Sequence, residues 1–158
     1  MFFKGDTFFM FRNSLIAFVL FTMYLGSSHP AMAQKSVPKQ TIVTAAQVNG
    51  TWETKSGTFK ILALGNQQLK VEFQGFYEYK TEYGPMANIG EGRGIAFIEG
   101  DTAIFKPEDA SENDQITLKF TKGRLIVTQE GSCGFGLNVT AAGTYRKVSS
   151  QNPKFETE

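Results

Sequence analysis

Apolar and polar side chains alternate along the middle of this chain, most clearly in the stretch LKVEFQGFYEYK at positions 69–80. Its odd-numbered positions carry mainly leucine, valine, phenylalanine and tyrosine, and its even-numbered positions mainly lysine, glutamate and glutamine. Because successive side chains of a β-strand point to opposite faces, this period of two predicts a long strand with one buried face. The same period recurs in QITLKFTK and in several shorter runs, whereas no window combines a helical period with helix caps.

The alternating runs, together with the short run around Trp52, predict eight strands in one domain. Turn-forming dipeptides such as Gly-Asn, Gly-Asp and Lys-Gly separate several of the runs, as expected of antiparallel hairpins. Closing the sheet removes exposed strand edges, so we predict an all-β fold, a single eight-stranded antiparallel up-and-down barrel. The predicted strands are residues 50–54, 58–64, 69–79, 94–99, 102–106, 115–121, 124–130 and 143–148.

The lengths of the connections predict that the two ends of the barrel differ. Successive connections of an up-and-down barrel lie alternately at its two ends, so the short turns fall together and the long connections fall together. Loops on a rigid scaffold commonly carry recognition, and we therefore expect binding at the loop-rich end. The short turns are at 65–68, 100–101 and 122–123, and the long connections are at 80–93, 107–114 and 131–142.

The first 33 residues have the organisation of a secretory signal peptide. Lys4 and Arg12 precede an apolar run, LIAFVLFTMYL, and an Ala-x-Ala site stands just before Gln34. The apolar run is shorter than the about 20 residues that span a bilayer, so cleavage is favoured over retention as an anchor. We predict a signal helix at 1–33, a leader segment at 34–48, the barrel at 49–148 and a flexible tail at 149–158, in a periplasmic or secreted protein.

Composition narrows the chemistry of the mature chain. Its only histidine, His29, belongs to the signal peptide, which excludes Ser-His and Cys-His nucleophile pairs and a His-ligated zinc site. We predict no metal, no cofactor and no enzymatic activity. Removing Lys4 and Arg12 from the 16 basic residues, and Asp6 from the 15 acidic ones, leaves 14 of each. A neutral chain with scattered charges favours neither nucleic acid nor a membrane after signal cleavage, and we expect a monomer.

A short motif at the start of the first predicted strand resembles a barrel family. Gly50-Thr51-Trp52 resembles the G-x-W signature of lipocalin-like barrels, whose tryptophan plugs the plain end and is often covered by an arginine of the last strand. This resemblance implies that Trp52 is buried at the end with the short turns and that Arg146 lies over it. An ordinary core tryptophan is the alternative interpretation.

The run CGFGLNVTAAGTYRK, from Cys133 to Lys147, resembles the C-terminal signature of small secreted bacterial β domains. Some of these domains sit beside lysozyme-inhibitor-type domains, so the resemblance implies a lysozyme-inhibitor-like, protein-binding module. This chain departs from the pattern of lysozyme-inhibitor-type domains in its loops. GEGRG at 90–94 lacks the serine and tyrosine of the inhibitory loops, and the chain contains no W-x-K-G stretch.

The predicted long connection KTEYGPMANIGEGRG, residues 80–94, holds the side chains that we expect to bind a protein partner. Tyrosine and arginine are frequent interface anchors, and this segment has both beside the turn-forming pair Gly84-Pro85. A solvated connecting loop is the alternative. The predicted partner-binding residues are Tyr83, Asn88, Glu91 and Arg93.

Aromatic side chains on the predicted inner face support a second functional hypothesis, carriage of a small apolar ligand inside the barrel. An eight-stranded barrel is also narrow enough to be filled by its own side chains, which we favour. The possible ligand-lining residues are Phe73, Tyr77, Phe105 and Phe120.

Cys133 is the only cysteine of the chain and is flanked by glycines at 131, 134 and 136. A reactive thiol needs a cationic neighbour, a helix N-terminus or a base, and none stands nearby in the sequence. We therefore predict a buried packing residue, because free cysteine is among the most buried residue types. A reactive thiol and an intermolecular disulfide are the alternatives.

Overall fold

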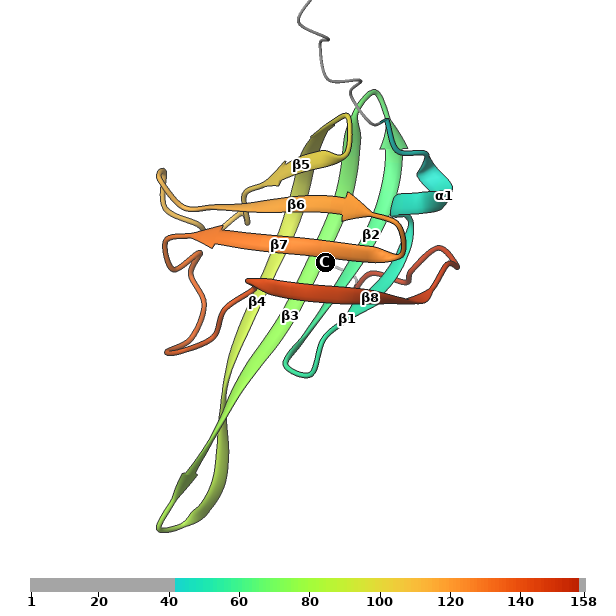
Figure 1. Ribbon diagram of the computed structural model, residues 1–158. Coiled ribbons are helices and arrows are strands. Elements are labelled where there is room, and N and C mark those ends of the chain that lie inside the picture. Colours follow the sequence, from blue (N-terminus) through green and yellow to red (C-terminus); the bar gives the residue numbers. More distant parts are fainter. Residues whose placement is uncertain (1–41, 157–158) are drawn as a thin grey trace, which may run out of the picture. The chain divides into compact units, whose positions relative to one another are not determined.

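The computed structural model describes residues 42–156, which form eight strands and one short helix (Figure 1). The predicted signal peptide 1–33, the cleavage site before Gln34 and the leader up to residue 41 lie outside the described residues, as do residues 157–158. The elements are α1 (Ala45–Val48), β1 (Gly50–Glu53), β2 (Gly57–Gly65), β3 (Gln68–Thr81), β4 (Gly84–Glu99), β5 (Thr102–Phe105), β6 (Gln115–Thr121), β7 (Arg124–Glu130) and β8 (Gly143–Ser149).

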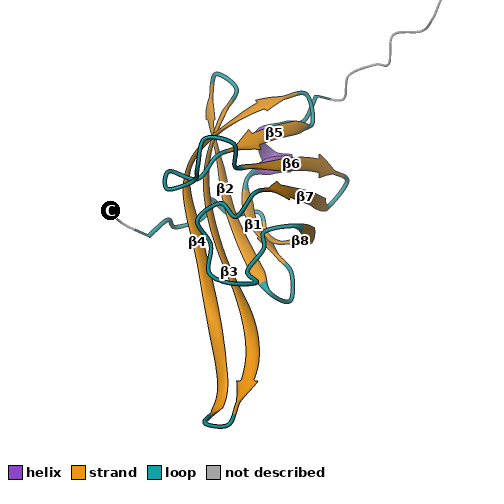
Figure 2. Ribbon diagram, turned by 90° about the vertical axis from the view of Figure 1, so that its left-hand side faces the viewer, coloured by secondary structure: helices purple, strands orange, loops and turns teal. Residues whose placement is uncertain are grey.

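Each strand pairs antiparallel with the strand that follows it, and β1 also pairs with β8, so the sheet closes into a barrel. The prediction of an all-β, eight-stranded up-and-down barrel is confirmed. Figure 2 shows the barrel strands gathered together and the paired strands β3 and β4 running on beyond them. Closure pairs the backbone N–H and C=O groups of the barrel strands with neighbouring strands, but the outer edges of these extensions have no neighbouring strand to pair with.

Inward-facing side chains from all the strands fill the barrel. In β6, for example, Ile116, Leu118 and Phe120 are buried while the residues between them are not, as a period of two requires. Burying one large apolar side chain stabilises a fold by about 1.5–3 kcal/mol, so this shared core holds the sheet closed. The largest fully buried side chains are those of Trp52, Tyr145, Phe59, Phe73, Phe105, Ile61, Leu69, Ile116, Leu118 and Leu125.

The two ends of the barrel differ, as the connection lengths predict. Two-residue turns join β2 to β3, β4 to β5 and β6 to β7 at one end, which we call the tight-turn end. Asn66 and Gln67, in the first of these turns, have φ angles of 49° and 60°, the left-handed conformation that a tight hairpin turn uses. The connections 106–114 and 131–142 lie at the opposite, loop-rich end.

The last residues of the predicted leader segment, 42–48, pack on the tight-turn end. Val48, at the end of α1, is buried in the core. The N–H of Val43 donates to the carbonyl oxygen of Gly100, in the turn between β4 and β5, at 3.2 Å. This part of the leader therefore belongs to the barrel domain.

Trp52 is buried at the tight-turn end, as the G-x-W resemblance implies. Its Nε1–H donates to the carbonyl oxygen of Val48 at 3.0 Å. The cation over its ring is Lys147, whose Nζ lies 4.7 Å from the ring centroid, so the expectation for Arg146 is wrong. Because Tyr145 points inward, Arg146 points outward, and Lys147, the cross-strand partner of Trp52, returns to the inner side.

The predicted long connection at 80–93 is wrong, because β3 and β4 run through it and meet at a turn formed by Glu82 and Tyr83. The ladder between them is unbroken from the pair Gln68 and Phe97 to the pair Thr81 and Gly84. The sequence conceals the part of β4 that precedes the predicted strand at 94–99, because positions 90, 92 and 94, on its inward side, are glycines. Without inward apolar side chains at these positions, no alternation marks this part of the strand.

Residues after β8 follow the outer face of the barrel and contact β3. The Nζ of Lys70 lies 5.0 Å from the ring centroid of Phe155, and the N–H of Glu156 donates to Oε2 of Glu72 at 2.9 Å. Ser149, predicted to begin a flexible tail, is the last residue of β8. The tail up to residue 156 thus has defined contacts with the barrel.

Candidate functional site

β3 and β4 continue past the loop-rich end as a two-stranded ribbon, residues 76–89, which we call the arm (Figures 1 and 2). β2 begins at Gly57, opposite Gly75, so it does not flank the arm. β5 pairs with β4 only from Ala96 onward. An isolated two-stranded ribbon is at best marginally stable in water, so contact with a partner would stabilise the arm.

Both faces of the arm carry exposed apolar side chains. On the face that continues the barrel interior, which we call the mouth face, the rings of Tyr77 and Tyr79 stack with centroids 6.4 Å apart. Met86, the cross-strand partner of Tyr79, is 51% exposed. On the opposite, outer face, Phe76 pairs with Ile89, which is 60% exposed. Clusters of apolar side chains in solvent commonly mark an interaction surface.

The four predicted partner-binding residues lie on or next to the arm but are spread along it. Tyr83 is at the tip and is 90% exposed. Asn88 is on the mouth face, where its Nδ2 donates to the carbonyl oxygen of Leu137 at 2.7 Å. Glu91 and Arg93 are on the outer face of β4, where the arm joins the barrel. At about 3.3 Å per residue, the set extends over roughly 30 Å, so it forms no single cluster.

The predicted ligand-lining residues separate into two groups. Tyr77 lies on the arm beyond the barrel and is 41% exposed, so the expectation that it lines an interior cavity is wrong. Phe73, Phe105 and Phe120 are buried in the barrel. Phe73 packs against two other phenylalanine rings at centroid distances of 4.8 and 5.0 Å. These three side chains are therefore part of the packed core.

The connection 131–142 folds across the loop-rich end of the barrel, and Phe135 is the side chain that it inserts. The Phe135 ring packs on that of Phe73. A Cβ at Gly90 would lie 2.8 Å from Cβ of Phe135, and one at Gly92 would lie 3.3 Å from its ring. The glycines of β4 thus form the seat of Phe135. Their spacing of two residues is a sequence signal for a bulky side chain packed on the inner side of a strand.

Hydrogen bonds hold the base of this connection to the barrel. Oε1 of Gln129 accepts the N–H of Ala141 at 2.7 Å, and its Nε2 donates to the carbonyl oxygen of Gly131 at 2.8 Å. The hydroxyl of Tyr145 donates to the carbonyl oxygen of Ala141 at 2.8 Å, and burial raises the pKa of this hydroxyl so that it stays a donor. The loop is fixed at both ends, and Leu137 remains 76% exposed beside the arm.

Cys133 is buried in this connection, which confirms the predicted packing position. Its N–H donates to Oδ2 of Asp114 at 2.8 Å, and its Sγ lies 3.5 Å from the carbonyl oxygen of Glu130. Burial, and secondarily the negative charge of Asp114, raise the pKa of the thiol. A raised pKa keeps the thiol protonated and weakly nucleophilic, so these surroundings do not activate it.

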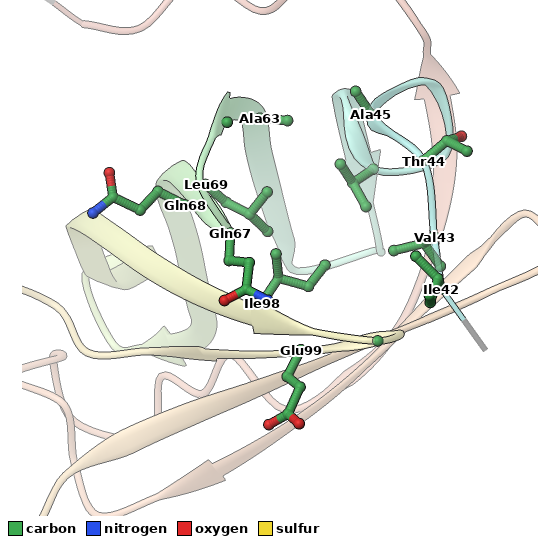
Figure 3. A pocket seen from close by; sticks show the side chains of 13 residues that line it. Ile42, Val43, Thr44, Ala45, Ala63, Gln67, Gln68, Leu69, Ile98 and Glu99 are labelled. Carbon is green, nitrogen blue, oxygen red and sulfur yellow. The ribbon is translucent and has the colours of Figure 1, made fainter. Parts of the chain in front are cut away.

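A hollow of about 500 Å³ opens at the tight-turn end, between the segment before α1 and the turns that join β2 to β3 and β4 to β5. Figure 3 shows Leu69 and Ile98 on one side of it and Val43 on the other, while the side chain of Glu99 points away. This volume is within the range of small-molecule sites, about 300–1,000 Å³. The lining is mainly apolar, so the hollow suits an apolar ligand.

Among residues 42–156, no three side chains of histidine, cysteine, aspartate or glutamate gather as a metal site would require. The helical part of the described chain includes no segment with the length and apolarity to cross a membrane. Comparisons of the chain with protein-family models, with curated proteins and with solved structures found no match. The arm and the loop beside it are the candidate functional site on geometric grounds.

Proposed function

We propose that this chain is an exported, non-catalytic binding module that recognises a protein partner through the arm and the adjoining connection 131–142. The observation that carries the proposal is a projecting ribbon with exposed apolar side chains on both faces. A flat partner could cover only one face of such a ribbon. A concave surface, such as the cleft of another protein, covers both.

The charges of the arm favour a protein cleft over a lipid bilayer. Glu78, Lys80 and Glu82 lie close to the tip, where they would enter the hydrocarbon first. Each such charge costs about 2.5–3.5 kcal/mol at the centre of a bilayer. A protein cleft can instead pair these charges and still bury the tyrosine and methionine side chains.

The mouth face and the loop form a corner in which a partner would be held from two sides. Asn88 links them through its hydrogen bond to the Leu137 carbonyl oxygen, which keeps the exposed Leu137 side chain close to the arm. Tyr77 and Tyr79 contribute rigid, amphipathic rings on the arm side. Tyrosine is one of the residue types that dominate the binding energy of interfaces.

A secreted lysozyme is the first partner to test, because the C-terminal run resembles domains that accompany lysozyme-inhibitor-type domains. The mature chain is titrated into c-type lysozyme, and the hydrolysis of bacterial cell walls is followed. Inhibition that Tyr83→Ala weakens, but Gln67→Ala at the tight-turn end does not, would support an inhibitor acting through the arm. Unchanged lysozyme activity would remove this partner but not the binding function.

The binding function itself is tested with a photo-reactive amino acid placed at Tyr83 and, as a matched control, at the exposed turn residue Asn66. The protein is expressed with its signal peptide, irradiated in cells, and the cross-linked proteins are identified by mass spectrometry. We expect one partner to be captured from position 83 and not from position 66. Equal capture from both positions, or capture from position 66 alone, would contradict a site on the arm.

Carriage of a small apolar ligand is the second candidate function, and the hollow at the tight-turn end favours it. Native mass spectrometry of protein purified from its own host would show the ligand as added mass. Filling the hollow with Ile98→Trp should remove that mass, whereas Tyr83→Ala should not. A protein that carries no added mass would count against the carrier.

A further inference from the structure

The edge of β3 that faces away from β4 is open along the arm. The N–H of Phe76 donates to the carbonyl oxygen of Ser56 at 2.9 Å, so even-numbered residues of this strand direct their backbone groups away from β4. The N–H and C=O groups of Glu78 and Lys80 therefore point outward. Neither residue has a backbone hydrogen bond on that side within the described part of the chain.

The opposite edge of the arm, along β4, is less available. The N–H of Gly136 already donates to the carbonyl oxygen of Ile89 at 3.2 Å. Pro85 has no N–H to offer on that edge. An added strand could therefore form backbone hydrogen bonds with both Glu78 and Lys80 on β3. Along β4, Pro85 and the occupied carbonyl oxygen of Ile89 would interrupt such a series of hydrogen bonds.

The open stretch of β3, Tyr77–Thr81, reads YEYKT and is complementary to itself. When two copies are placed antiparallel about Tyr79, Glu78 of each copy lies opposite Lys80 of the other. Because the backbone N–H and C=O groups of both residues point away from β4, each such pair exchanges two backbone hydrogen bonds. Tyr79 then faces Tyr79 of the second copy on the mouth face.

The charges of this stretch have no cross-strand partner within their own arm. Glu78 lies opposite Ala87, and Lys80 lies opposite Pro85. Opposite charges directly across a strand pair are stabilising, and like charges are destabilising. A second copy in this register supplies the missing opposite charge to both residues.

We propose that a second copy of this chain docks on the open edge of β3, so that two arms form one four-stranded ribbon with a twofold axis at Tyr79. This ribbon places Tyr77 and Tyr79 of both copies on one face, next to each other. It also gives the arm the additional strands that a two-stranded ribbon lacks. The pairing stands independently of any other partner of the arm.

The contact is short, because the loop before β2 covers the amide of Phe76 and leaves only residues 77–81 open. An interface of this length is far smaller than the about 1,600 Å² of a stable protein complex. The dimer is therefore weak and concentration-dependent. Sedimentation equilibrium over a series of protein concentrations is the suitable measurement.

Charge reversal tests the register. Glu78→Lys and Lys80→Glu each turn both ion pairs into like-charge pairs, and each should weaken dimerisation by about tenfold or more. The double variant E78K/K80E restores opposite charges and should dimerise like the original chain. The proposal would be overturned if the single substitutions did not weaken dimerisation, if the double variant stayed monomeric, or if the original chain did not dimerise.

A disulfide tests the twofold axis in a separate way. In a Cys133→Ala background, Tyr79→Cys places two thiols opposite each other across the axis and should give a disulfide-linked dimer under mild oxidation. Met86→Cys, on the same face but on β4, the outer strand of the four-stranded ribbon, is the matched control and should stay monomeric. Equal cross-linking of both variants would show random collision and would contradict this pairing. Far-UV circular dichroism checks that each variant is folded.

Discussion

Replacing Trp52 by alanine tests whether the tight-turn end is closed by this one side chain. The ring is 1% exposed, packs edge-on against Phe120 at 5.9 Å between centroids, and donates a hydrogen bond to the Val48 carbonyl oxygen. Deleting a buried tryptophan in this way costs about 3–5 kcal/mol. The Val48 carbonyl oxygen also loses its partner, so we expect a loss near the upper end of this range.

Trp52→Phe separates the two contributions. It keeps most of the buried ring but removes the Nε1–H donor, and an unsatisfied buried polar group costs about 1–3 kcal/mol. The free energy of unfolding is measured for residues 34–158 by urea titration with far-UV circular dichroism, because the variants lack the only tryptophan of the chain. If Trp52→Ala lowered it by less than about 1 kcal/mol, the tryptophan would be peripheral and the packing argument would fail.

Three further predictions concern neighbouring features. Lys147→Ala should lower the free energy of unfolding by about 1–2 kcal/mol, because Nζ of Lys147 covers Trp52 and donates to the carbonyl oxygens of Ala46 and Gln47 at the end of α1. The control Arg146→Ala should change the free energy of unfolding by less than about 0.5 kcal/mol. Equal effects of the two variants in the same urea titration would contradict the assignment of Lys147. Gly90→Ala should displace Phe135 and cost about 1–3 kcal/mol, whereas Glu91→Ala next to it should be nearly neutral, and hydrogen exchange of residues 131–142 should speed up only in the first variant. Cys133 should react slowly with a thiol reagent in the native protein and rapidly in urea, and rapid labelling of the native protein would refute the buried assignment. Because the pKa of the folded thiol is raised above the ordinary 9.0, the contribution of this thiol to stability is present below about pH 9 and is lost as the pH rises further.

The architecture of the barrel was predictable from the sequence because it depends on local chemistry. Period-two alternation in segments such as 115–121 reflects the pleat of a strand, and turn residues such as Gly100 and Gly123 reflect the left-handed conformations of tight turns. Both signals act between near neighbours in the chain. The strand order and the two unlike ends followed from them, and the structure confirms both.

The arm was not predictable in this way, because its definition depends on contacts between distant segments. β4 lacks inward side chains at Gly90 and Gly92 because Phe135, more than 40 residues later, fills that space. A pattern that looks for alternating apolar residues sees only a glycine-rich loop there. The placement of Tyr77 outside the barrel likewise depends on where β2 begins, which residue 77 does not encode.

The question of whether Arg146 or Lys147 lies over Trp52 also separates what the sequence determined from what the tertiary structure decided. The sequence determined that a basic side chain of the last strand comes near Trp52, since both neighbours are basic. Which of them does so depends on the face to which the strand turns each side chain, and that face is set by the burial of Tyr145 in the assembled core. Local pattern thus determined the strands and turns of this protein, whereas the packing of distant segments decided which side chains are covered and which are left exposed.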